Sequence, residues 1–224
     1  MPLVYQHNIN ETTKLAVWHI EEPDDFFLQR VPLKKDVSHP HKRLQHLAGR
    51  YLLPFLFEDF PLKEILIADT RKPFLEKEQY HFSISHCGDY AAAIVSKTER
   101  VGIDIELITP KIERVQHKFV SDEELLFLDD EYRSLMQQSR LSENSNMEFL
   151  TMLWSAKESI FKWYSHGQMD FKNHMQLNGP VNFSENGMIG LPFAMMKEET
   201  RYFTISARLF EGLVLAWVNT GATS

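Results

Sequence analysis

The feature that most constrains the fold is a dense run of strand-like segments between residues 81 and 107. HFSIS at 81–85 alternates apolar and polar residues, and YAAAIVS at 90–96 and RVGIDIEL at 100–107 follow at hairpin distances. Consecutive strands joined by short turns predict an antiparallel sheet. Further strands are expected at 14–20, near 64–68, at 201–209 and at 212–218.

Helices are expected in three places. Apolar residues recur at helical spacings from 38 to 57, although Pro54 should bend or end that helix early. Ser121 and Glu124 form an S-x-x-E capping box, which predicts a helix start. A third helix is expected from about 147 to 165, ending at Gly167, and the polar stretch 137–146 before it reads as a mobile loop.

Composition predicts a folded protein and excludes several classes. The 224 residues are 43% hydrophobic and 25% charged, enough for one large domain or two of about 110 residues. A net charge of -7 disfavours a nucleic-acid binder, which needs a basic face. Cys87 is the only cysteine, so an intrachain disulfide is impossible, and a reducing cytoplasm fits. We expect neither secretion nor membrane spanning, because no signal-like start and no run of about 18 apolar residues occurs.

The segment VGIDIE places two carboxylates side by side. Period-two geometry sends Asp104 and Glu106 to one strand face, with Gly102 leaving room beside them. Adjacent like charges repel, and a divalent cation such as magnesium, which prefers oxygen ligands, would relieve that repulsion. The alternative is a strand with an exposed acidic face.

The segment WSAKESIFKWY carries a second charged pair. Glu158 and Lys162 lie four residues apart, hence on one helix face, and Trp154 lies one turn before Glu158. Glu followed by Lys at this spacing is also an ordinary stabilising helix pair. Neither segment decides the function alone.

Together, VGIDIE, about fifty intervening residues and W-x-x-K-E-x-x-x-K resemble the signature of the 4'-phosphopantetheinyl transferase superfamily. RKPFL at 71–75 and FSISHCGDYAAAIV at 82–95 resemble the Lys-Pro and Ser-His segments of that family, in the same order. Length and layout resemble its large, surfactin-synthetase-activating type. The resemblance covers residues 71 to 162, with weaker similarity at 41–53 and 119–124.

The resemblance implies roles around a metal ion. Asp104, Glu106 and Glu158 would hold Mg²⁺ and, through it, the diphosphate of coenzyme A. Glu158 would also take the proton of the acceptor serine, directly or through a water. Lys162 would contact the diphosphate and steady the leaving group, and Lys157 is a further coenzyme A contact.

It also implies a grip on the nucleotide. Ser85 and His86 would bind the phosphates, with His86 on the 3'-phosphate, and Lys72 of the Lys-Pro turn would lie near the adenine. Either Arg43 or Arg50 would clamp the 3'-phosphate, with Arg50 preferred. The alternative for His86 is a structural hydrogen-bonding role, and the alternative for the two arginines is a solvated helix face. Arg71 departs from the glycine usual at its position.

The implied fold is α+β, with two similar α/β subdomains related by a pseudo-twofold axis. Residues 1–98 would grip coenzyme A, and residues 99–224 would carry the metal site and catalytic helix. The implied reaction is transfer of 4'-phosphopantetheine from coenzyme A to a serine of an apo acyl or peptidyl carrier protein, releasing 3',5'-ADP, by a cytoplasmic monomer. Two alternatives remain open: a non-catalytic binding module for coenzyme A or a carrier protein, and a metal-dependent phosphodiesterase.

A basic stripe suggests where the carrier protein docks. Lys111, Arg114 and Lys118 would share one face of a helix, beside an apolar surface that includes Phe119 and Val120. A positive stripe in an acidic chain could steer an acidic partner, although an ordinary solvated face is the alternative.

Overall fold

The structure, a computed structural model, describes residues 2–32, 37–70, 72–125 and 145–221. The chain divides into two compact units. The first unit comprises Met1–Ile105, Lys162–His166 and Asn219–Ser224, and the second comprises Glu106–Phe161 and Gly167–Val218. Each unit contains sheet and helix, which confirms the predicted α+β class. Along the chain, the first boundary between the units follows Ile105. The predicted boundary near residue 98 stays a prediction.

The first unit is built on an antiparallel sheet of order β1-β2-β6-β5. Its strands are β1 (Leu3–Asn8), β2 (Thr13–His19), β5 (His81–Cys87) and β6 (Tyr90–Ser96). The predicted strands at 14–20, 81–85 and 90–96 are therefore confirmed. β6 is central and almost wholly buried, whereas β5 lies at the edge.

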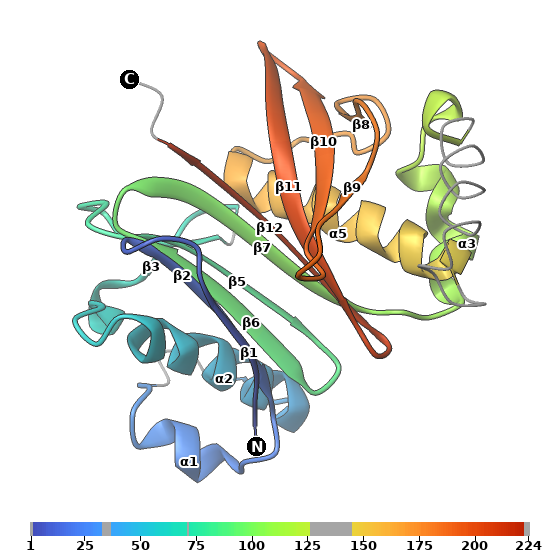
Figure 1. Ribbon diagram of the computed structural model, residues 1–224. Helices are drawn as coiled ribbons and strands as arrows, with labels where there is room; N and C mark the ends of the chain where they lie inside the picture. Colours follow the sequence, from blue (N-terminus) through green and yellow to red (C-terminus); the bar gives the residue numbers. More distant parts are fainter. Residues whose placement is uncertain (1, 33–36, 71, 126–144, 222–224) are drawn as a thin grey trace. The chain divides into compact units, whose positions relative to one another are not determined.

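Helix α2 (Pro40–Leu56) packs on this sheet, with the short helix α1 (Asp24–Leu28) beside it (Figure 1). Leu47, Leu52 and Leu53 are fully buried in the shared core. A Cβ at Gly49 would lie 2.5 Å from Cγ2 of Ile84, so glycine allows α2 to approach β5 closely. The expectation that Pro54 ends the helix early is wrong, because the helix continues to Leu56, whereas a bend at Pro54 stays a prediction.

Short elements complete the first unit. They are the 3₁₀ turn η1 (Leu62–Glu64), the paired strands β3 (Leu66–Ile67) and β4 (Pro73–Phe74), and the first part of β7 (Glu99–Leu107). The strands predicted near 64–68 and at 100–107 are thus confirmed. Arg71 lies outside the described residues.

The second unit contains most of a sheet of order β7-β12-β11-β10-β8, with β9 paired to β10. Its strands are β8 (Met175–Leu177), β9 (Asn182–Phe183), β10 (Ile189–Met196), β11 (Thr200–Phe210) and β12 (Leu213–Gly221), of which β11 and β12 were predicted. Its helical elements are α3 (Lys111–Val115), η2 (Gln116–Lys118) and most of α5 (Ser145–Tyr164). The predicted loop at 137–146 lies almost entirely outside the described residues. Within the described ranges, every helix is too short or too polar to cross a membrane.

Candidate active site

Two strands of the first unit meet through serine side chains. Oγ of Ser83 accepts a hydrogen bond from the backbone N–H of Ile103 at 3.2 Å. Ser85 lies two positions further along β5, and its Oγ donates a hydrogen bond to Oδ1 of Asp104 at 2.8 Å. Both serines point toward β7 because residues two apart in a strand share a face. Ser85, predicted from the Ser-His segment, is therefore next to the predicted metal ligand Asp104.

Lys162 completes this group from the last turn of α5. Its Nζ donates to Oδ1 of Asp104 at 2.7 Å, to Oγ of Ser85 at 2.8 Å and to the carbonyl of Ile103 at 3.1 Å. The Lys162 side chain is 24% exposed and that of Asp104 is 4% exposed. The structure therefore brings together three predicted site residues, with the Lys162 side chain partly exposed.

The second oxygen of Asp104 fits a metal ligand. Oδ2 is buried and has no hydrogen-bond partner among the residues that the structure describes. An unsatisfied carboxylate oxygen is costly in a protein interior, and a hard cation is one group that would satisfy it. Within the described ranges, no three His, Cys, Asp or Glu side chains form a metal-binding group. Asp104 belongs to the first unit, whereas Glu106 and Glu158 belong to the second, so their joint role stays a prediction.

A cluster of two histidines and an arginine includes His86, the residue that follows Ser85 on β5. The rings of His86 and of His46 on α2 are 5.8 Å apart between centroids, and Nη1 of Arg50 donates to Nδ1 of His46 at 3.2 Å. The pKa of exposed His86 is lowered by desolvation of its ring and then by the charges of His46 and Lys162. Burial likewise lowers the pKa of Arg50. These groups are suited to bind a phosphate.

His46 was not predicted from the sequence. It lies four residues before Arg50, and this helical spacing is the signal that could have revealed it. Arg43, the alternative phosphate clamp, lies instead with Nε 2.8 Å from Oδ2 of Asp24 on α1. This pairing favours Arg50 over Arg43.

Lys72 lies on the turn that leads into β4. Its Nζ donates to the carbonyl of Lys162 and to Oγ of Ser165, at the end of α5. Burial, followed by the charge of Arg100, lowers the pKa of Lys72 to about 8. The lysine predicted to lie near the adenine thus contacts the end of α5 directly.

Glu158 lines a cavity within the second unit. The cavity has a volume of about 1000 Å³, and Trp154, Phe161 and Phe171 form much of its apolar wall. Glu158 is half-buried there, and Lys111 and Lys118 also line the space. On the same unit, Oε1 of Glu106 accepts a hydrogen bond from Nε1 of Trp154 at 3.4 Å. A carboxylate in a partly apolar cavity is suited to accept a proton.

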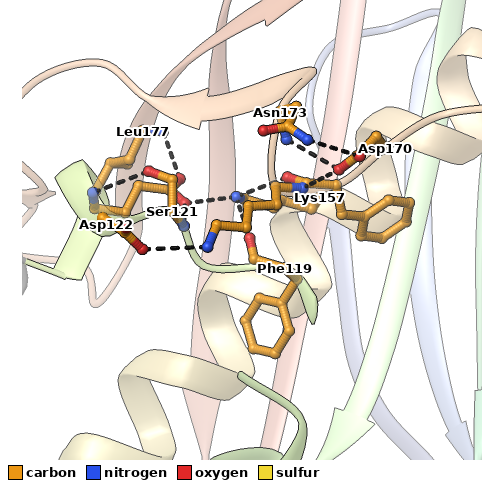
Figure 2. A network of polar contacts seen from close by, with 10 residues as sticks. Phe119, Ser121, Asp122, Lys157, Asp170, Asn173 and Leu177 are labelled. Carbon is orange, nitrogen blue, oxygen red and sulfur yellow. Dashed lines mark hydrogen bonds and ion pairs between the residues drawn. The ribbon is translucent and has the colours of Figure 1, made fainter. Parts of the chain in front are cut away.

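Lys157 has a different role from the predicted one. Its side chain is fully buried, and Nζ donates to Oε2 of Glu124 at 2.7 Å and to the carbonyls of Phe119 at 2.6 Å and Phe171 at 3.0 Å (Figure 2). An ammonium group has three hydrogens, so all are used inside the protein. Burial lowers the pKa of Lys157, opposed by the charge of Glu124. The predicted contact with coenzyme A is therefore replaced by a structural role.

The predicted capping box is confirmed. The backbone N–H of Glu124 donates to Oγ of Ser121 at 3.1 Å, and Oε2 of Glu124 accepts from the N–H of Ser121 at 3.0 Å. Oε1 of Glu124 also accepts from the N–H of Leu177 at 2.8 Å. Residues 122–125 are helical, and the continuation predicted through Leu126 and Leu128 lies outside the described residues.

The predicted basic stripe is only partly present. Helix α3 ends at Val115 and a 3₁₀ turn follows, so Lys118 is not on the same helix as Lys111. The expected apolar docking surface is wrong for Phe119 and Val120, which are buried in the core. Lys111 and Lys118 nevertheless both line the cavity that contains Glu158.

Comparison with known proteins finds similarity over the segment that carries both charged motifs. Residues 100–205 match the model of the 4'-phosphopantetheinyl transferase superfamily. Enterobactin synthase component D of Salmonella austin is 30% identical over 124 residues, which cover 55% of this chain and 48% of that protein. Enterobactin synthase component D of Escherichia coli (strain K12) is 34% identical over 125 residues, 54% of each chain. 4'-Phosphopantetheinyl transferase AcpT of the same strain is 29% identical over 131 residues, 58% of this chain and 62% of that protein.

The chain thus spans about half to three fifths of the length of these relatives. The matched segment includes both charged motifs, with Asp104, Glu106, Glu158 and Lys162. Residues 100–205, just under half of this chain, are therefore similar to the 4'-phosphopantetheinyl transferase superfamily.

Proposed function

We propose that the protein transfers the 4'-phosphopantetheine arm of coenzyme A to a serine of an apo carrier protein, releasing 3',5'-ADP. The observation that carries the proposal is the group formed by Lys162, Asp104 and Ser85, with the unsatisfied Oδ2 of Asp104. The family match and the matched relatives support the same reaction class.

In the proposed reaction, Glu158 accepts the proton of the serine hydroxyl, and the serine oxygen forms a bond to phosphorus. The phosphoanhydride bond to the leaving 3',5'-ADP breaks, and the ammonium group of Lys162 stabilises the negative charge that develops there. His86 and Arg50, with His46 beside them, hold the 3'-phosphate. Asp104, Glu106 and Glu158 are the proposed magnesium ligands, and the ion, when bound, would neutralise diphosphate charge.

The test is incubation with coenzyme A, magnesium and a panel of apo carrier proteins, followed by intact-mass analysis. We expect one carrier to gain the mass of one phosphopantetheine and its Ser→Ala variant to gain nothing. If coenzyme A binds but neither a modified carrier nor free phosphopantetheine is formed, the protein is a binding module. Free phosphopantetheine beside an unmodified carrier would indicate a phosphodiesterase.

His86→Ala is expected to weaken binding of coenzyme A about tenfold or more, because a hydrogen bond to a charged group is lost. Dephospho-coenzyme A, which lacks the 3'-phosphate, should bind the variant and the wild type alike. Isothermal titration calorimetry measures both affinities. Equal losses for the two ligands would place His86 elsewhere.

The lowered pKa of His86 gives this interaction a pH dependence. Near neutral pH the free imidazole is mostly uncharged, and protonation strengthens its bond to phosphate. Affinity for coenzyme A should therefore rise as pH falls from 7.5 to 6. The rise should be smaller in His86→Ala, and an identical slope in both proteins would contradict the assignment.

Reversing Lys111 and Lys118 to Glu is expected to raise KM for an acidic carrier protein several-fold, since both exposed lysines line the cavity that contains Glu158. The effect should be largest at low salt, because added salt screens exposed charges. The control is Arg201→Glu, an exposed charge reversal on β11 that matches each of the two single reversals. A carrier KM that stays at the wild-type value at low ionic strength would show that the partner docks elsewhere.

A further inference from the structure

Helix α5 ends in an unusual way. Its last helical residue is Tyr164, and Ser165 follows in the left-handed conformation with φ 70°. Glycine is the residue favoured at this position after a helix, because a Cβ makes the conformation costly. The prediction of a helix from about 147 to 165 is thus confirmed, but the residue that follows it in the left-handed conformation is Ser165, before the expected Gly167. Serine in this place calls for a compensating interaction.

The hydroxyl of Ser165 supplies that interaction. Oγ lies 3.0 Å from the carbonyls of both Lys162 and Trp163, to which it can donate. It also accepts a hydrogen bond from Nζ of Lys72, which donates at the same time to the carbonyl of Lys162. A cation at the last carbonyls of a helix opposes their partial negative charge.

A positively charged lysine at position 72 has an unfavourable electrostatic environment. The charged groups facing it across a cavity of about 220 Å³ are Arg100 on β7, His81 on β5 and Glu78 on the connecting turn. Arg100 disfavours a second positive charge, and burial disfavours any charge. An uncharged side chain would avoid both costs. The presence of an ammonium group at this place therefore indicates that it helps to position the end of the helix.

That helix end carries Lys162. The backbone carbonyl of Lys162 is held by Lys72, while its side chain reaches Asp104 and Ser85. All of these contacts lie within the first unit. A shift of the helix end would move Nζ of Lys162 away from the carboxylate, and displacements of about 1 Å can cost about a hundredfold in rate.

We propose that Lys72 is a positioning residue: with Ser165 it fixes the C-terminal end of α5, from which Lys162 extends. The inference rests on the proposed transferase function for its kinetic consequences only. It differs from the contact with adenine expected from the sequence, because the ammonium group is directed at the protein itself.

Two variants test the proposal. Lys72→Met keeps the length of the side chain and removes the charge, and Lys77→Met, at an exposed lysine on the turn that follows β4, is the control. Ser165→Gly removes the hydroxyl and supplies the residue that the backbone conformation favours. We expect kcat to fall about tenfold or more in both variants, with little change in Lys77→Met. Affinity for 3',5'-ADP should change less than twofold.

The pH profile provides a further readout. The charge of Lys72 is lost as pH rises through about 8, so the wild-type rate should decline over that range, and Lys72→Arg should lack this decline because arginine stays charged. A matching decline in Lys72→Arg would contradict the proposal. A large loss of 3',5'-ADP affinity with unchanged kcat in Lys72→Met would instead place Lys72 on the nucleotide and overturn it.

A readout that does not need activity separates this proposal from the proposed function. Amide hydrogen exchange at residues 162–166 should accelerate in Lys72→Met and Ser165→Gly relative to wild type and Lys77→Met. If wild-type protein modifies no carrier, the proposed function fails while this measurement still tests the link. Unchanged exchange in both variants would overturn it.

Discussion

Replacing Glu158 with glutamine is expected to lower the rate of phosphopantetheine transfer by about two to four orders of magnitude. Glutamine has nearly the same shape as glutamate but cannot accept the serine proton, and it also removes one charge from the proposed metal site. Glu158 is half-buried in the wall of a cavity of about 1000 Å³, so the substitution should not disturb the core. The loss should appear in kcat when carrier modification is followed by intact mass.

The control is Glu123→Gln, the same chemical change at an exposed position of the second unit. It should leave the rate within about twofold of wild type, since surface substitutions away from a site have small effects. Circular dichroism and thermal unfolding establish that Glu158→Gln is folded. Substantial transfer by a folded Glu158→Gln protein would remove Glu158 from both proposed roles.

Local patterns predicted the elements on which the site is built. Period-two alternation between 81 and 107 located β5, β6 and β7, because side-chain direction in a strand follows from sequence position alone. The capping box was found for the same reason, since both of its hydrogen bonds join residues three apart. Such features need no knowledge of distant contacts.

Features that depend on distant contacts escaped prediction. His46 joins the cluster proposed to bind phosphate because α2 packs closely on β5 at Gly49. Lys72 contacts residues about ninety positions further along the chain. Periodicity describes neither relation, and a motif lysine indicates a charge without showing where the charge is directed.

Lys157 shows how adjacency in sequence misleads. It precedes Glu158 directly, but successive residues in a helix are rotated by about 100°, so neighbours face different surroundings. Glu158 lines the cavity, whereas Lys157 is directed into the core. A charged residue in a catalytic motif can therefore serve the fold alone.

Lys157→Met is expected to lower the free energy of unfolding by about 3–5 kcal/mol, the usual cost of removing one partner from a buried ion pair. The loss is large because Glu124 would keep its negative charge at 2% exposure without the ammonium group that lies 2.7 Å away. The carbonyls of Phe119 and Phe171 would each lose a donor as well. Urea unfolding followed by circular dichroism measures the change.

Lys172→Met is the matched control from the same network. Lys172 lies 3.2 Å from Asp122, but these side chains are 37% and 87% exposed, so its loss should cost at most about 1 kcal/mol. Adding Glu124→Gln to Lys157→Met should recover part of the stability, because glutamine removes the stranded charge and still accepts the capping bond from Ser121. A Lys157→Met protein as stable as Lys172→Met would show that the buried pair contributes little. A double variant that is no more stable than Lys157→Met alone would show that the cost does not come from the unpaired charge of Glu124.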